Sequence, residues 1–393
     1  MTAAANPCPV CRSADTAILD ARVEVPVLMN RLYATPQAAR AAARGPLELV
    51  RCRACGFVWN SAFRAELIEY DGDYENDQTH SEVFARHFRE RAEAVVAAAP
   101  AGGNVDFLEI GCGQGRFIEQ VAAVAGDRLG AAEGFDPAWR GAEGDGPGGA
   151  RIHKCYFDAT TAGLMQRAPS LVVSRHTIEH VPDPVGFLIA IREALGAASR
   201  ATLFVETPCV DWIFERQAMQ DFFYEHCSLF SAGSLALALR TAGFHAPKVS
   251  HVFGGQYLWA QASTVGDDAT STPPAATAGA DLSGAHDRFT RHWREAVRAA
   301  AAEGPVALWG AGAKGVTFAL LIDPENRVLD HVVDINPGKQ GRFFPASALP
   351  VLSPEASASR APRTIFVMNP NYLDEIAADL AARGLTPRLV PIN

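Results

Sequence analysis

A glycine-rich turn between two apolar stretches is the part of this sequence best suited to bind a ligand. The apolar run at 105–110 contains Glu109 and is followed by three alternating glycines, Gly111, Gly113 and Gly115. Glycines allow a tight bend and a close approach to a ligand, and the first N–H groups of a following helix stay free to bind it. Dinucleotide sites instead use G-x-G-x-x-G, with an acid about 20 residues further on. The turn therefore predicts a ligand site whose spacing differs from the dinucleotide fingerprint.

Two groups of histidines and glutamates could perform acid–base chemistry. In the first group, His176, Glu179 and His180 have the i, i+3, i+4 spacing that places side chains near one face of a helix. These residues could bind a metal, or the Glu-His pair could simply hold a loop, and His180 could be catalytic or structural. His176 is nearest the end of the preceding apolar run, and we expect it to face the ligand.

The second group is the pair Glu225-His226, inside the aromatic stretch 222–231. An imidazole titrates near neutral pH, and an adjacent carboxylate can fix its tautomer, so this pair suits a general base. The alternative is a surface loop with an incidental histidine.

Four cysteines form two C-x-x-C knuckles, Cys8 with Cys11 and Cys52 with Cys55. Two such knuckles can hold one zinc ion in a tetrahedron of thiolates, and a small domain gains folding free energy from it. The gap of about forty residues exceeds that of a compact zinc ribbon and indicates an insertion. We expect structural Zn²⁺, with a redox pair or fortuitous spacing as the alternatives.

The composition is that of a globular protein with more than one domain. The 393 residues are 48% hydrophobic and 20% charged, and the formal net charge is −9. The acidic balance argues against nonspecific binding to nucleic acid or anionic membranes. We find no apolar run near the roughly 18 residues of a membrane helix and no basic, apolar leader, so we expect no membrane partner and a cytoplasmic location.

Three predicted domains must position these residues. They are a zinc-binding domain at 1–65, a doubly wound α/β domain at 66–265 and a smaller Rossmann-like α/β domain at 285–393, with a Pro/Ala/Thr-rich linker at 266–284. Central strands are expected at 105–110, 130–135, 171–174 and 202–206, and helices at 81–99, from 114 and at 187–195. In the C-terminal domain, a helix at 287–302 and a strand at 306–309 precede a second glycine-rich turn at 310–315.

The first turn resembles motif I of the class I S-adenosylmethionine (SAM) methyltransferases, in which it passes under the methionine part of the cofactor. The resemblance implies that Glu109, Gly111, Gly113 and Gly115 bind SAM. It further implies that Asp136, after the next strand, accepts the ribose hydroxyls and that Asp158, beside Phe157, flanks the adenine. His176 is expected to face the same cofactor.

Over nearly its whole length the chain resembles the sugar C-methyltransferases of deoxysugar biosynthesis. The resemblance depends on the paired knuckles, the first turn, the Glu225-His226 pair and the stretches 310–315, 333–334, 339–342 and 352–355. It implies methyl transfer from SAM to a carbon beside the ketone of a nucleotide-activated sugar. His226 would remove the alpha proton, Glu225 would orient His226, and His180 and Tyr74 would stabilise the enolate.

Two departures from that family concern the acceptor side. The family usually has a tyrosine three residues before the catalytic histidine, where this sequence has Phe223 followed by Tyr224, and the stretch around Tyr74 is spaced differently. One alternative is an O- or N-methyltransferase of another small metabolite. A second is an NAD-dependent oxidoreductase that uses the second turn and Asp334, although Lys314 suits a nucleotide diphosphate better. A third, a zinc-ribbon RNA methyltransferase, is disfavoured by the acidic charge.

Overall fold

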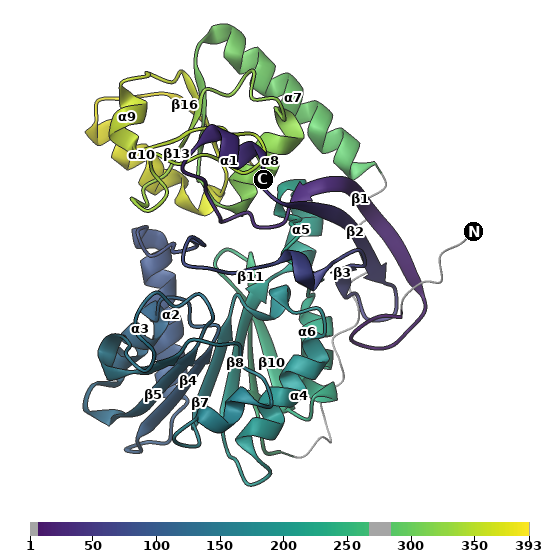
Figure 1. Cartoon of the computed structure of the whole chain (residues 1–393), viewed down its shortest axis with the longest axis vertical. Coiled ribbons are helices and arrows are strands. Elements are labelled where there is room, and N and C mark those ends of the chain that lie inside the picture. The colour runs from purple at the N-terminus through teal and green to yellow at the C-terminus, as the bar shows by residue number, and fades with distance from the viewer. Residues whose placement is uncertain (1–6, 267–283, 393) are drawn as a thin grey trace.

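A computed structural model describes residues 7–266 and 284–392 and arranges them around three sheets (Figure 1). The predicted linker at 266–284 lies almost wholly outside the described residues. None of the described helices combines the length and the apolar character needed to cross a bilayer.

The central sheet has seven strands in the order β10-β11-β8-β7-β4-β5-β6. They are β4 (Val105–Ile110), β5 (Leu129–Phe135), β6 (Arg151–His153), β7 (Leu171–Arg175), β8 (Thr202–Pro208), β10 (His245–Val252) and β11 (Tyr257–Ser263). Neighbouring strands are parallel except at β11, which is antiparallel to β8 and β10. Because the chain winds outward from β4 in both directions, the ligand crevice should lie beyond the carboxyl ends of β4 and β7.

Helices cover both faces of this sheet because successive strand residues point to opposite sides. Those on the face that carries Phe107 are α2 (Glu82–Ala97) and α3 (Arg116–Ala125). Those on the face that carries Leu108 are α4 (Pro184–Leu195) and α6 (Ala232–Thr241). The short helix α5 (Val210–Arg216) follows β8. The doubly wound arrangement predicted for the central domain is confirmed.

The C-terminal unit contains a second, wholly parallel sheet in the order β14-β13-β12-β15-β16. Its strands are β12 (Val306–Trp309), β13 (His331–Val333), β14 (Val351–Leu352), β15 (Thr364–Val367) and β16 (Arg388–Pro391). Its helices are α7 (Ala285–Glu303), α8 (Ala313–Ile322), α9 (Pro354–Ala358) and α10 (Leu373–Ala382). The winding direction reverses between β12 and β15, so this sheet has its own crevice at their carboxyl ends.

The N-terminal module links both α/β units. Its antiparallel sheet consists of β1 (Thr16–Pro26), β2 (Arg44–Cys52), β3 (Val58–Asn60) and β9 (Ser228–Leu229). The strand β9 comes from the segment predicted to form the central domain. The predicted boundary near residue 65 therefore divides this one sheet, with β1 to β3 before it in the chain and β9 after it. The helix α1 (Pro36–Arg40) lies beside the C-terminal unit (Figure 1), where Ala346 N–H donates to Ala39 C=O at 2.8 Å.

Candidate active site

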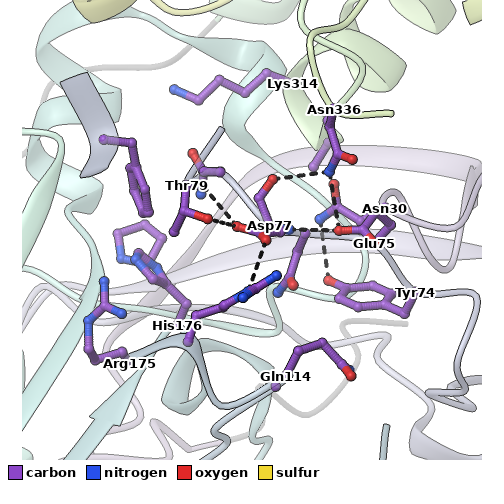
Figure 2. A pocket seen from close by; sticks show the side chains of 18 of the residues that line it. Asn30, Tyr74, Glu75, Asp77, Thr79, Gln114, Arg175, His176, Lys314 and Asn336 are labelled. Atoms are coloured by element: carbon purple, nitrogen blue, oxygen red, sulfur yellow. Dashed lines mark hydrogen bonds and ion pairs between the residues drawn. The ribbon is translucent and has the colours of Figure 1, made fainter. Parts of the chain in front are cut away.

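One cavity of about 1350 Å³ is lined by residues that follow the carboxyl ends of β4 and β7 in the central sheet and of β12 and β15 in the C-terminal sheet. Figure 2 shows part of its wall. Its wall includes Gly111 and Gly113 of the first glycine-rich turn and Gly310 and Gly312 of the second. His226 also lines it. The topology therefore brings both predicted ligand turns and the predicted base to a single cavity.

The three glycines of the first turn have different structural roles. All have positive φ, at 76° for Gly111, 54° for Gly113 and 70° for Gly115, which is a region that favours glycine. A Cβ at Gly111 would collide with Thr177, and one at Gly115 would lie 2.7 Å from Pro147. A Cβ at Gly113 would meet nothing within 4 Å. Gly113 thus offers a ligand open space, whereas Gly115 begins α3 and is not part of the cavity wall.

Two buried carboxylates flank this turn. Glu109 is 2% exposed, its Oε2 has no hydrogen-bond partner among the described residues, and burial raises its pKa to about 8 against the opposing charge of Arg175. Asp136 accepts hydrogen bonds from Gly113 N–H at 2.7 Å and Ala138 N–H at 2.8 Å. Burial nevertheless raises the pKa of Asp136. Both side chains line the cavity, as the resemblance implied.

The remaining predicted cofactor residues differ in their placement. His176 lines the cavity, with Nδ1 3.4 Å from Glu179 Oε1 and its ring edge-on to Tyr257. Asp158 does not line it: its carboxylate accepts from Thr160 and Thr161 N–H, and these bonds lower its pKa. Phe157 does line the cavity. Asp158 thus caps an exposed turn next to the cavity-lining Phe157, and its adenine contact stays a prediction.

The predicted acid–base residues gather in one hydrogen-bonded cluster. Glu225 is 1% exposed and accepts from Tyr74 OH and from Met29 N–H, each at 2.8 Å. Its Oε2 lies 3.9 Å from His180 Nδ1. His180 Nδ1 in turn lies 2.8 Å from Tyr70 OH. Burial raises the pKa values of Glu225, Tyr74 and Tyr70.

His226 is separate from Glu225 despite their adjacency in the chain. Glu225 bonds toward Tyr74 and the N-terminal module, whereas His226 packs edge-on to Phe223 and to His180. The predicted orienting contact from Glu225 is not made, because Glu225 lies in a bend and its two carboxylate oxygens accept from Met29 and Tyr74. The carboxylate on the His226 side is Glu179, which lies within 4.8 Å of ring nitrogens of His180 and His226.

Burial, reinforced by the neighbouring His180, lowers the pKa of His226 to about 3. Its Nδ1 has no hydrogen-bond partner within the described part of the chain. A neutral imidazole with a free ring nitrogen can accept a proton from a substrate in the cavity.

Tyr70 is a site residue that the sequence reasoning missed. The displaced Tyr224 is fully buried, its OH bonds to Arg64 N–H at 2.8 Å, and it does not line the cavity. Phe223 lines the cavity in the place where the family has a tyrosine. Tyr70 places a phenol beside His180 from another part of the chain. In the sequence, the only sign of this role was its spacing of four residues from Tyr74.

Two lysines in or beside the second turn also line the cavity. Lys314 Nζ lies 2.9 Å from Asp221 Oδ1 and 4.8 Å from the centroid of the Trp212 ring. Lys339 is 5% exposed, and its ammonium lies beside Gly312. Asp334 accepts from Ala311 N–H at 2.7 Å.

The four knuckle cysteines meet although about forty residues separate the pairs in sequence. Cys8 Sγ lies 3.6 Å from Cys55 Sγ, and Cys11 Sγ lies 3.4 Å from Cys52 Sγ. Four sulfurs around zinc at about 2.3 Å would be about 3.8 Å apart. The thiol cluster therefore fits one tetrahedral zinc ion.

Comparisons with known proteins agree with this architecture. Residues 77–248 match the family model described as a methyltransferase domain, and residues 280–385 match the C-methyltransferase C-terminal domain. The chain is a SAM-dependent methyltransferase. The α/β fold class predicted from the sequence is confirmed, and the C-terminal match does not support the NAD-dependent alternative.

Relatives include a C-methyltransferase, NovU of Streptomyces niveus, which is 27% identical over 358 residues, or 84% of this chain and 82% of that protein. This methyltransferase is also similar to three solved structures. They are the CurJ carbon methyltransferase (14% identity, 47% and 56% of the two chains, TM-score 0.34), a SAM-dependent methyltransferase from Aquifex aeolicus (14%, 48% and 94%, 0.31) and human N-acetylserotonin methyltransferase with SAM (11%, 46% and 54%, 0.33). The family matches and NovU together support SAM-dependent C-methylation.

Proposed function

We propose that the protein transfers a methyl group from SAM to a carbon alpha to the ketone of a nucleotide-activated deoxysugar, with His226 as the general base. The observation that carries the proposal is the shared cavity, which is lined by His226 and by both glycine-rich turns. Its volume of about 1350 Å³ suits two ligands better than one, since single-ligand pockets are usually about 300–1,000 Å³.

The first turn is the proposed SAM site. The open space at Gly113 would be occupied by the ligand, and the two hydrogen bonds on Asp136 leave lone pairs for the ribose hydroxyls. The unpaired oxygen of Glu109 and the free Nε2 of His176 are buried polar atoms that a polar ligand would satisfy. SAM bound there would supply an electrophilic methyl group and leave as S-adenosylhomocysteine.

The residues between the turns would handle the acceptor. His226 would take the alpha proton at a ring nitrogen, and the electron pair of that C–H bond would move into the enolate. Tyr74 and His180, which both contact Tyr70, would stabilise the enolate oxygen, with the Tyr74 O–H turned from Glu225 toward the substrate. Preorganised donors of this kind stabilise charge as it develops, and a positioned base contributes about 10²–10⁴-fold to the rate. Methylation of the carbon would complete the reaction.

The second turn is the proposed site for the nucleotide diphosphate. The N-terminus of α8, with Lys314 and Lys339 beside it, combines free N–H groups with two ammonium groups. A phosphate would compete with Asp221 for Lys314.

Structural zinc is the second part of the proposal. Zinc at Cys8, Cys11, Cys52 and Cys55 would fix the ends of a module whose β3 strand pairs with β9, next to His226. We expect elemental analysis to find one zinc per chain, and Cys52→Ser to lose the metal and lower the melting temperature. Cys155→Ser, at a half-buried lone cysteine, is the matched control. Metal-free protein that melts at the same temperature as the zinc-containing protein would contradict the assignment.

The function is tested by mass spectrometry of the products formed from SAM and a panel of nucleotide-4-keto-6-deoxysugars. The expected product gains a methyl group on carbon. A methyl group on oxygen or nitrogen of any panel member, or no product from any keto sugar, would instead favour a methyltransferase of another small metabolite.

A further inference from the structure

A single arginine joins the proposed cofactor site to the segment that carries Tyr70 and Tyr74. We call residues 70–81 the strap; they run along the cavity between the central and C-terminal units. The strap carries the phenols of the acid–base cluster at one end and leads into α2 at the other. Its geometry therefore decides where Tyr74 lies relative to His226.

Arg140 holds the middle of the strap with its whole guanidinium. Nε donates to Gly72 C=O at 2.7 Å, Nη2 donates to Tyr74 C=O at 2.9 Å, and Nη1 and Nη2 both lie 3.1 Å from Glu75 Oε2. This fork of donors fits two carbonyls and a carboxylate together, which the ammonium of a lysine cannot reproduce.

The backbone of Arg140 is tied to the first glycine-rich turn. Arg140 N–H donates to Gln114 Oε1 at 3.2 Å, and Gln114 Nε2 donates to Ala138 C=O at 3.0 Å. Asp136, at the start of this segment, bonds to Gly113 N–H. Residues 136–140, which form one rim of the proposed SAM site, are thus fixed between the turn and the strap.

Glu75 extends the connection to the C-terminal unit. Its Oε1 accepts from Asn336 Nδ2 at 3.2 Å (Figure 2), while Oε2 accepts from Arg140. Asn336 Nδ2 also lies 3.2 Å from Asp77 C=O. The strap is therefore held from both sides, by the cofactor rim through Arg140 and by the proposed nucleotide site through Asn336.

We propose that Arg140 is a positioning residue that couples cofactor binding to the placement of Tyr74. When the adenosine rim at 136–140 is fixed by ligand, Arg140 fixes the strap, and the acceptor site is completed. Coupling free energies are reciprocal, so a fixed strap also favours cofactor binding. The inference depends on the proposed position of the cofactor and goes beyond it in linking the two sites.

Hydrogen-exchange mass spectrometry of residues 70–78, with and without S-adenosylhomocysteine, tests the coupling without a sugar substrate. In the unaltered protein we expect the ligand to slow exchange by about tenfold, within the usual range for coupled sites. In Arg140→Ala the effect should fall below about twofold while the ligand still binds, and Arg140→Lys should restore only part of it. A merely structural role for Arg140 would change exchange equally with and without ligand.

Arg128→Ala is the matched control, since Arg128 also bonds two backbone carbonyls, Gly103 and Pro100, but lies outside the cavity wall. It should behave as the unaltered protein does. If Arg140→Ala fails to fold, Glu75→Gln removes the charge pair while keeping the shape of the side chain. Full ligand-dependent protection in Arg140→Ala, or none in the unaltered protein, overturns the coupling.

The substitution Asp136→Asn tests the proposed cofactor position separately from the coupling through Arg140. Weakened binding of S-adenosylhomocysteine in Asp136→Asn supports the cofactor position whatever the strap does. Unchanged binding would put the cofactor elsewhere, and the coupling would then be wrong as well.

Discussion

The two glycine-rich turns share their backbone chemistry and differ in their side chains. In each, an aspartate after the next strand bonds an N–H of the turn at 2.7 Å and its own i+2 N–H at 2.8 Å: Asp136 with Gly113 and Ala138, and Asp334 with Ala311 and Asn336. Two residues before the first glycine, however, the first turn has the buried acid Glu109 and the second has Leu308. Among the described residues, the lysines that line the cavity are Lys314, in the second turn, and Lys339, beside it.

This difference indicates how one backbone arrangement can serve two ligands. SAM carries a sulfonium cation, which suits a turn beside a carboxylate, whereas a diphosphate suits a turn beside ammonium groups. The strand–turn–helix thus supplies hydrogen-bond donors in both units, and neighbouring side chains select the sign of the ligand charge.

Removing the charges of Lys314 and Lys339 should produce the largest difference between the ligand affinities of the two turns. We expect the double substitution Lys314→Gln and Lys339→Gln to weaken binding of a nucleoside diphosphate by about 100-fold, since hydrogen bonds to charged groups contribute about 1.5–3 kcal/mol each. SAM affinity should change little. Isothermal titration calorimetry with both ligands measures this, with the exposed Lys248→Gln as control. Equal losses of affinity for SAM and for the nucleoside diphosphate would contradict the proposed difference between the two turns.

Replacing each aspartate in turn by asparagine should have a smaller effect, and each substitution should weaken the binding of only one of the two ligands. In Asp136→Asn, the NH2 group that replaces Oδ2 cannot accept from Gly113 N–H, so this hydrogen bond of the turn is lost. We expect about tenfold weaker SAM binding, in line with about 1–3 kcal/mol for a buried unpaired group. Asp334→Asn should weaken only the nucleoside diphosphate. The same titrations measure both, and a SAM defect in Asp334→Asn would contradict the division of roles.

The pH dependence of SAM binding should show the smallest effect. Burial raises the pKa of Glu109 to about 8, so the folded protein holds a proton that the unfolded chain releases near pH 4.5. Stability from this proton is present below pH 4.5 and is lost as the pH rises through 8. Because the ionised form should bind the SAM cation, affinity should rise about fivefold between pH 7 and pH 8. Glu109→Gln should remove this rise, and a rise of the same size in Glu109→Gln would assign it to the titration of SAM itself.

The sequence predicted the elements that have a regular pattern. The run at 105–110 is β4, and the helix expected at 81–99 is α2 at Glu82–Ala97, because hydrophobic periodicity and the following glycines mark both. By contrast, β9 has two residues and completes a sheet whose other strands are far away in the chain. A strand that short has no periodicity, so only the tertiary structure could reveal it.

Site residues were predictable where chemistry follows local order and not where it depends on long-range contacts. Gly111, Gly113 and Asp136 follow from the positions of strand ends and line the cavity, whereas Gly115 does not. Sequence adjacency suggested that Glu225 supports His226, but Glu225 lies in a bend and its carboxylate accepts from Tyr74, 151 residues earlier in the chain. Tyr70 and Arg140 also act through partners that are distant in the chain, His180 and residues 72–75. The spacing of Tyr70 from Tyr74 was its only local signal, and Arg140 had none.

The most direct test of the account is deuterium incorporation at the alpha carbon of a nucleotide-4-keto-6-deoxysugar in deuterated water, with S-adenosylhomocysteine in place of SAM. Followed by mass spectrometry, it isolates proton removal from methyl transfer. We predict exchange by the unaltered protein and by His251→Gln, at an exposed histidine, and a loss of about 10²–10⁴-fold in His226→Gln. Exchange that persists in His226→Gln would contradict His226 as the base, and no exchange in the unaltered protein on any keto sugar that it binds would contradict the carbon-acid mechanism.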